Sequence, residues 1–242
     1  MRVGINRSWA ASTLMRFDTL VLQTFGRLAG IRAFLELLDR ALPESEWQEN
    51  EELRTRAEGE EWDFAEFDGE REIVDERFQF WLPRFTTYSV VTLLHTVLET
   101  QLAACAQRAC SEKRAPFQPT DIRGRGIDAA ALYLARIGVY DVRQDPAWPT
   151  ICDLRDLRHL IVHRAGTKGQ SDEHRKTAQR LANAYAGRVV FPDGDWSWYG
   201  EVWISILLCR DFVAAVQAFF DRLFNALDLP PRYQARITRN AG

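Results

Sequence analysis

Apolar residues recur every three or four positions through most of this chain, which is the period of a helix buried on one side. The first such segment begins after Ser12 or Thr13, either of which can cap a helix. The last runs from about residue 200 to 227 and is apolar on two sides, which is typical of an interior helix. The sequence therefore predicts an all-α protein built as a helical bundle.

Prolines and glycines divide this pattern into segments. Pro43 is expected to end the first helix, and Pro83 to separate an acidic, exposed helical segment (44–76) from a long helix over about 85–111. Two prolines and two glycines make residues 113–126 a loop. Three shorter helices are expected after this loop, over about 126–137, 150–164 and 172–186.

One segment departs from helical spacing. Residues that favour strands flank the turn signal Pro192-Asp193-Gly194, which predicts a small β-hairpin near 188–199. We therefore expect two parts that pack as one unit. Residues 1–83 form an N-terminal helical extension with the acidic segment, and residues 84–242 form the main helical domain.

Charge and cysteine content narrow the class of protein. A formal net charge of −3 lacks the basic field of proteins that coat duplex nucleic acid, although nearly all positive side chains are arginines, which suit phosphate. The four cysteines form no CxxC pair, so free thiols are expected. The N-terminus lacks the apolar stretch of a signal peptide, and the longest strongly apolar run (202–209) is too short to span a bilayer. We expect a cytoplasmic protein without membrane contact.

The helix expected over 150–164 carries an arginine in an unusual place. At 100° per residue, Arg158 falls between Val162 and Ala165 on the arc of apolar side chains. An arginine there must pair with a carboxylate or face a cleft, because an unpaired buried charge is strongly destabilising. The pattern leaves both interpretations open.

Two histidines of the same helix, His159 and His163, lie one turn apart on its polar side. Asp156 shares their stripe but is seven residues from His163, about 10 Å along the axis, so one ion cannot easily bind both. A catalytic zinc needs three protein ligands, and no HExxH arrangement is present. We expect neither a metal nor a cofactor.

Residues 158–163, followed by Gly166, resemble the Rx(4–6)H motif of HEPN domains, the nucleotide-binding domains of higher eukaryotes and prokaryotes. The upstream segment TYSVVTLLHTVLETQL, the loop TDIRGRGIDAAALYL and the hairpin near Phe191 are similar to one prokaryotic subgroup of HEPN-like proteins. The resemblance covers about residues 86–227 and leaves 1–83 unexplained. Asparagine is common after the arginine in this family, and His159 stands there in this chain.

The resemblance implies an HEPN-like helical bundle and a metal-independent endoribonuclease, either a toxin with an antitoxin or other regulatory partner, or an effector of defence against phage. It implies that two motifs meet across a homodimer and that the ribose 2′-OH attacks the adjacent phosphorus of RNA. His163 would act as general base or acid, Arg158 would bind the phosphate, and His159 would support the site or contact the phosphate. The alternatives are an inactive module that binds a nucleotide or a partner protein, and a helical scaffold in which Arg158 makes a structural ion pair.

Weaker candidates surround the motif. Arg123 and Arg125 precede a helix N-terminus and, with Arg164, are candidates for binding phosphate; a flexible turn is the other interpretation of the loop. His95 and Glu99 lie one turn apart and, like Asp156, are candidates for a supporting shell; an ordinary surface pair is the alternative. Three aromatic residues of the hairpin suit either base stacking or packing on the core: Trp196, Trp198 and Tyr199.

Overall fold

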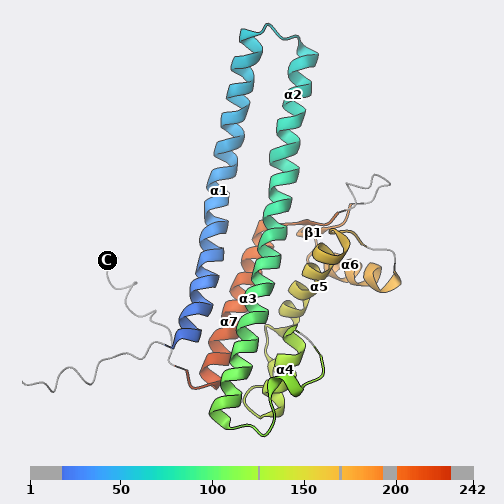
Figure 1. Ribbon diagram of the computed structural model, residues 1–242. Helices are drawn as coiled ribbons and strands as arrows, with labels where there is room; N and C mark the ends of the chain where they lie inside the picture. The colour runs from blue at the N-terminus through green and yellow to red at the C-terminus, as the bar shows by residue number, and fades with distance from the viewer. Residues whose placement is uncertain (1–17, 125, 169–170, 193–200, 230–242) are drawn as a thin grey trace, which may run out of the picture.

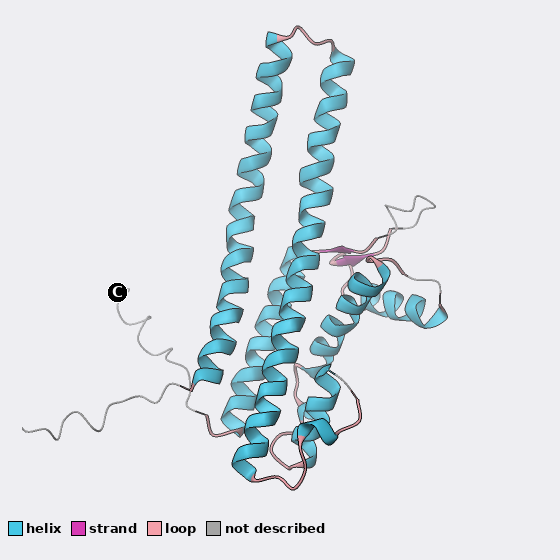
Figure 2. Cartoon of the chain, in the orientation of Figure 1, coloured by secondary structure: helices cyan, strands magenta, loops and turns pink. Residues whose placement is uncertain are grey.

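The computed structural model describes residues 18–124, 126–168, 171–192 and 201–229. Within these residues the protein is all-α apart from one two-stranded sheet, as the sequence predicted. Two long antiparallel helical segments stand side by side and rise beyond a bundle formed by the other helices (Figure 1; Figure 2 separates helix from strand by colour).

The first helix, α1, spans Thr19–Gly59 and begins at Asp18, whose side chain accepts a hydrogen bond from the Leu20 N–H. The expected end at Pro43 is wrong, because the helix continues through this residue. Proline in a helix interior costs about 3 kcal/mol. Burial of Leu35 before it and Leu53 after it offsets that cost, since each lies in an apolar cluster shared with other helices.

The break expected at Pro83 is also wrong. Helix α2 (Phe64–Glu76) continues through a π-helical turn (Arg77–Trp81) into α3 (Leu82–Lys113). The Leu82 N–H bonds back to the Arg77 carbonyl, so the hydrogen-bond pattern widens just before Pro83 and absorbs its missing donor. Helical structure therefore crosses residue 83 without interruption.

By length and composition alone, the continuous helix Phe64–Lys113 qualifies as a candidate membrane span. Its most apolar window has a mean hydropathy of 1.3, and 56% of that window is buried inside the structure. A core helix of a soluble protein passes the same test, so this feature is weak support for membrane contact.

The remaining elements lie along α3, in the lower part of the molecule in Figure 1. They are α4 (Gly126–Arg136), α5 (Trp148–Arg164), α6 (Asp172–Ala184), β1 (Val189–Val190), β2 (Trp203–Ile204) and α7 (Ile206–Ala226). Strand β1 pairs antiparallel with β2, with Val189 opposite Ile204. The first strand of the expected hairpin, β1, lies within the range 188–199, but its partner β2 lies after this range. Helix α7 begins at Ile206, after β2, and not near residue 200.

One large apolar core joins α1, α3, α4, α5 and α7, and so includes residues from both sides of position 83. Helix α7 is buried along most of its length, as its two apolar faces predicted. All four cysteines are free, and Cys105, Cys110 and Cys209 are buried. A second, small cluster around Leu53, Val74 and Phe78 holds the far parts of α1 and α2 together.

Candidate functional site

Helix α5 is fixed at its beginning by a buried carboxylate. Asp145 is 3% exposed and accepts two hydrogen bonds of 2.7 Å from Arg222 of α7, together with one from the Ala147 N–H. Burial alone would raise the pKa of Asp145, but the hydrogen bonds from Arg222, Tyr140 and Ala147 outweigh it and lower the pKa. The charged pair therefore locks the start of α5 onto α7.

The end of α5 is fixed just as firmly. Ala165 and Gly166 both take the left-handed conformation, with φ of 49° and 77°, and turn the chain away from the helix. The Tyr88 hydroxyl lies 2.0 Å from where a Cβ on residue 166 would be, so only glycine fits there. Tyr88 also donates to the Val202 carbonyl, and the Val202 N–H donates to the Gly166 carbonyl at 2.7 Å. These contacts tie the last turn of α5 to α3 and to the strand region.

The exposed face of α5 differs from the expected arc. Val162 is 45% exposed and Ala165 is also exposed. The apolar residues on either side of Arg158 are therefore not buried. The guanidinium of Arg158 thus lies at the rim of the core, partly exposed. The buried positions of this helix are Trp148, Ile151, Leu154, Leu157 and Leu160.

Arg158 and His163, the two ends of the motif, contact each other. Arg158 Nη1 lies 3.2 Å from His163 Nε2. A guanidinium can only donate, so Nε2 must accept, and the neutral imidazole then carries its proton on Nδ1. Within the described residues no carboxylate pairs with Arg158. The guanidinium is therefore held by an uncharged partner and keeps donors for an anion.

His174, which the sequence analysis missed, joins the two histidines of α5. The His159 ring centroid lies 4.7 Å from that of His163 and 5.9 Å from that of His174 at the start of α6. Burial lowers the pKa of His159, and the neighbouring His163, His174, Arg164 and Arg158 lower it further. A sequence signal existed, since Ser171 precedes His174 at a helix start and caps it, but no spacing rule links residue 174 to 159.

In the part of the chain that the structure describes, no three His, Cys, Asp or Glu side chains converge to hold a metal ion. The His174 Nδ1 lies 2.6 Å from the Ser171 hydroxyl, so that nitrogen is already in a hydrogen bond. The cluster as it stands offers hydrogen-bond donors and acceptors rather than a coordination sphere.

The fourth histidine of the chain, His95, lies on α3, which packs against α5. His95 is 6% exposed, and its Nδ1 lies 3.7 Å from a Glu99 oxygen. Burial lowers the pKa of His95, and the positive charges of Arg158 and Arg155 lower it further. Three of the four histidines thus contact one another at the end of α5, and His95 lies on the helix that packs against it. His95 is buried and the Glu99 side chain is partly exposed, and a supporting role for the two residues stays a prediction.

Asp156 is engaged elsewhere. Its carboxylate pairs with Arg155 of its own helix at 3.1 Å and with Arg180 of α6 at 2.7 Å. Arg155 also reaches Asp128 of α4, and Arg180 also pairs with Asp153. This network holds α4, α5 and α6 together, so Asp156 is a structural residue and not part of the Arg158–His163 contact.

The predicted phosphate-binding arginines are dispersed. Arg164 is exposed and lies near His159, which it affects electrostatically. Arg123 is exposed in the loop before α4, and no contact links it to the motif among the described residues. Arg125 and the three hairpin aromatics lie outside the described residues: Trp196, Trp198 and Tyr199.

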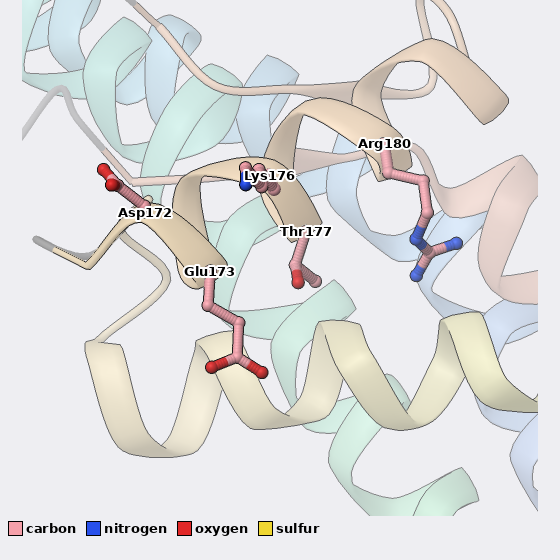
Figure 3. A pocket seen from close by; sticks show the side chains of 5 residues that line it. All are labelled: Asp172, Glu173, Lys176, Thr177 and Arg180. Atoms are coloured by element: carbon pink, nitrogen blue, oxygen red, sulfur yellow. The ribbon is translucent and has the colours of Figure 1, made fainter.

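A shallow hollow of about 470 Å³ runs along α6 (Figure 3). All five residues that line it come from this one helix, and Glu173 and Thr177 point to the same side of it. Arg180, at the far end, is already paired with Asp153 and Asp156. A groove that is open to solvent, and whose arginine is already in ion pairs, is a poor site for a small molecule.

Comparison of the chain with protein-family models, with curated proteins and with solved structures gives no match.

Proposed function

We propose that this protein is a metal-independent endoribonuclease of the HEPN type, with Arg158 and His163 as its catalytic pair. In the cell it would act as a toxin, under the control of an antitoxin, or as an effector of defence against phage. The observation that supports this best is the 3.2 Å contact between Arg158 and His163 at the partly exposed end of α5, with no carboxylate on the guanidinium within the described residues.

The contact has a direct chemical consequence. In the free protein Arg158 occupies the lone pair of His163 Nε2, the lone pair that a general base needs. A phosphate of RNA is a stronger acceptor than an imidazole, so the guanidinium turns to the phosphate when substrate binds. His163 Nε2 is then free to take the proton of the ribose 2′-OH.

The 2′-oxygen forms a bond to the adjacent phosphorus while the bond from phosphorus to the 5′-oxygen breaks. Arg158 stabilises the charge on the phosphorane oxygens. A second histidine must give a proton to the leaving 5′-oxygen, and the partner's His163 in a homodimer supplies it. The products are a 2′,3′-cyclic phosphate and a 5′-hydroxyl. Val162, exposed and apolar beside the motif, provides a contact for the dimer.

The distribution of charge also supports RNA binding. The acidic segment, residues 44–76, holds 15 acidic and 3 basic side chains, a formal charge of −12, which leaves +9 on the remainder of the chain. This segment forms the far parts of α1 and α2, which rise away from α5 (Figure 1). The acidic overall composition is therefore compatible with an RNA substrate at α5.

The test is a pair of substitutions, His163→Ala and Arg158→Ala, each assayed on total cellular RNA beside a melting curve. Both variants should lose cleavage. The free energy of unfolding of His163→Ala should lie within about 0.5 kcal/mol of the parent's, because His163 is exposed. Arg175→Ala, an exposed arginine on α6, is the control and should cleave normally. Cleavage by His163→Ala at the parent's rate would exclude this site. Binding of RNA by a parent that never cleaves it would favour the inactive module.

A further inference from the structure

Two buried nitrogen atoms on facing helices have no hydrogen-bond partner among the described residues. They are Nε2 of His95 on α3 and Nε of Arg158 on α5. Helices α3 and α5 pack against each other in the core, and Arg158 acts on the charge of His95. Buried polar groups without a partner are rare in folded proteins, so two of them on helices that pack against each other call for an explanation.

The protonation of His95 makes the two atoms complementary. The carboxylate of Glu99 lies 3.7 Å from Nδ1 and can only accept, which favours the ring proton on Nδ1. Burial lowers the pKa of His95; Glu99 opposes this, while Arg158 and Arg155 add to it. The ring is therefore neutral near pH 7, and its Nε2 presents a lone pair. Arg158 Nε–H is a donor that needs such an acceptor.

We propose that His95 is a positioning residue for Arg158: its Nε2 accepts a hydrogen bond from the Arg158 Nε–H through one bridging water. This bond fixes the plane of the guanidinium from its buried side. The two Nη groups then point outward as a fork, one of them toward His163. The effect on cleavage rests on the proposed function, whereas the bond itself does not.

Glu99 is held in place from α4. Its Oε1 lies 3.1 Å from where a Cβ on Gly126 would be, so the carboxylate packs against the start of α4. With the proposed bond, a line of contacts runs from Gly126 through Glu99 and His95 to Arg158. This arrangement gives a reason for the buried position of His95, one turn before Glu99 on α3.

The test compares two substitutions of similar polarity, His95→Gln and His95→Asn. A glutamine amide reaches the position of Nε2 and can accept there, whereas an asparagine amide reaches only the position of Nδ1. We expect His95→Gln to cleave RNA within about threefold of the parent, and His95→Asn to be slower by about 10- to 100-fold at saturating RNA. Equal rates for the two variants would overturn the positioning role.

A second readout needs no enzymatic activity. The Arg158 Nε–H resonance, assigned by its loss in Arg158→Lys, should exchange slowly with solvent in the parent and in His95→Gln, and rapidly in His95→Asn. Slow exchange that persists in His95→Asn would overturn the inference. If the parent cleaves no RNA but the resonance responds as expected, the proposed function fails and the His95–Arg158 bond stands.

Discussion

At the scale of single residues, Arg158 differs from the neighbouring arginines in its partners. Arg155 and Arg180 are each paired with two carboxylates, so their charge is used within the fold. Arg158 contacts the imidazole of His163, and under the proposed function its charge serves the phosphate of RNA. These arginines of α5 and α6 therefore divide into those that join helices through carboxylates and Arg158, which makes no ion pair within the described residues.

Replacing Arg158 with lysine should separate these roles. Arg158→Lys keeps the positive charge but removes the Nε–H and the planar fork, so cleavage should fall about tenfold or more with little change in melting temperature. Arg180→Lys is the matched control, because Arg180 serves the carboxylates of α5; it should lower the melting temperature and leave the rate near that of the parent. Initial cleavage rates and melting temperatures of both variants, compared with those of the parent, test this separation.

The histidines also predict how stability depends on pH. The pKa values of His95 and His159 are lowered in the folded protein, chiefly by burial. Between these values and about 6.5, the ordinary pKa of histidine, the unfolded chain binds more protons than the folded one. The free energy of unfolding should therefore fall as the pH drops below about 6.5. Urea titrations from pH 7.5 to 5 should show this, and the slope should lessen in His95→Gln. A free energy of unfolding that rises on acidification would contradict the assignment.

At the scale of elements, the sequence predicted both limits of α5 to within two residues. The expected range, 150–164, is close to Trp148–Arg164, because Pro149 and Gly166 mark the two ends by rules that are local in the chain. The same rules were wrong at Pro43 and Pro83, where distant contacts decide. Packing on both sides of Pro43 preserves α1, and a π-helical turn accommodates Pro83.

The tie between Gly166 and Tyr88 gives a prediction for α5 as an element. In Gly166→Ala a methyl group meets the Tyr88 hydroxyl and the backbone is strained at a φ of 77°, so stability should drop by about 2–4 kcal/mol. Ala165→Gly, one residue earlier, relieves a left-handed alanine and should stabilise by up to about 1 kcal/mol. Chemical denaturation measures both. A neutral Gly166→Ala would show that Tyr88 does not hold the end of the helix.

At the scale of the whole molecule, the sequence predicted an all-α bundle but not how its charge is arranged. A net charge of −3 conceals an acidic segment carried at the far end of two long helices and a basic remainder. Nor could periodicity predict that His95 and His174 meet the motif, because they lie on other helices 63 residues before Arg158 and 16 residues after it. Such proximity follows from tertiary packing alone.

Assembly is the property of the whole molecule on which the mechanism depends. We expect a homodimer with α5 near the two-fold axis, where Val162 would contact its symmetry mate. Val162→Asp would place two like charges together and should give a monomer, whereas Leu207→Asp, at an exposed position on α7, should not. Light scattering at micromolar concentration tests this. A parent that is strictly monomeric would argue against the two-motif mechanism and leave the fold unaffected.

The central claim is cleavage of RNA by Arg158 and His163 without a metal ion. The most direct measurement is the cleavage of a defined RNA by the parent and by His163→Ala in excess EDTA, with analysis of the new ends. We predict that the parent cleaves fully under chelation and leaves 2′,3′-cyclic phosphate and 5′-hydroxyl ends, while His163→Ala leaves the RNA intact. Loss of the parent's activity in EDTA, restored by zinc or manganese, would contradict the account and favour a metal bound by the histidines of α5.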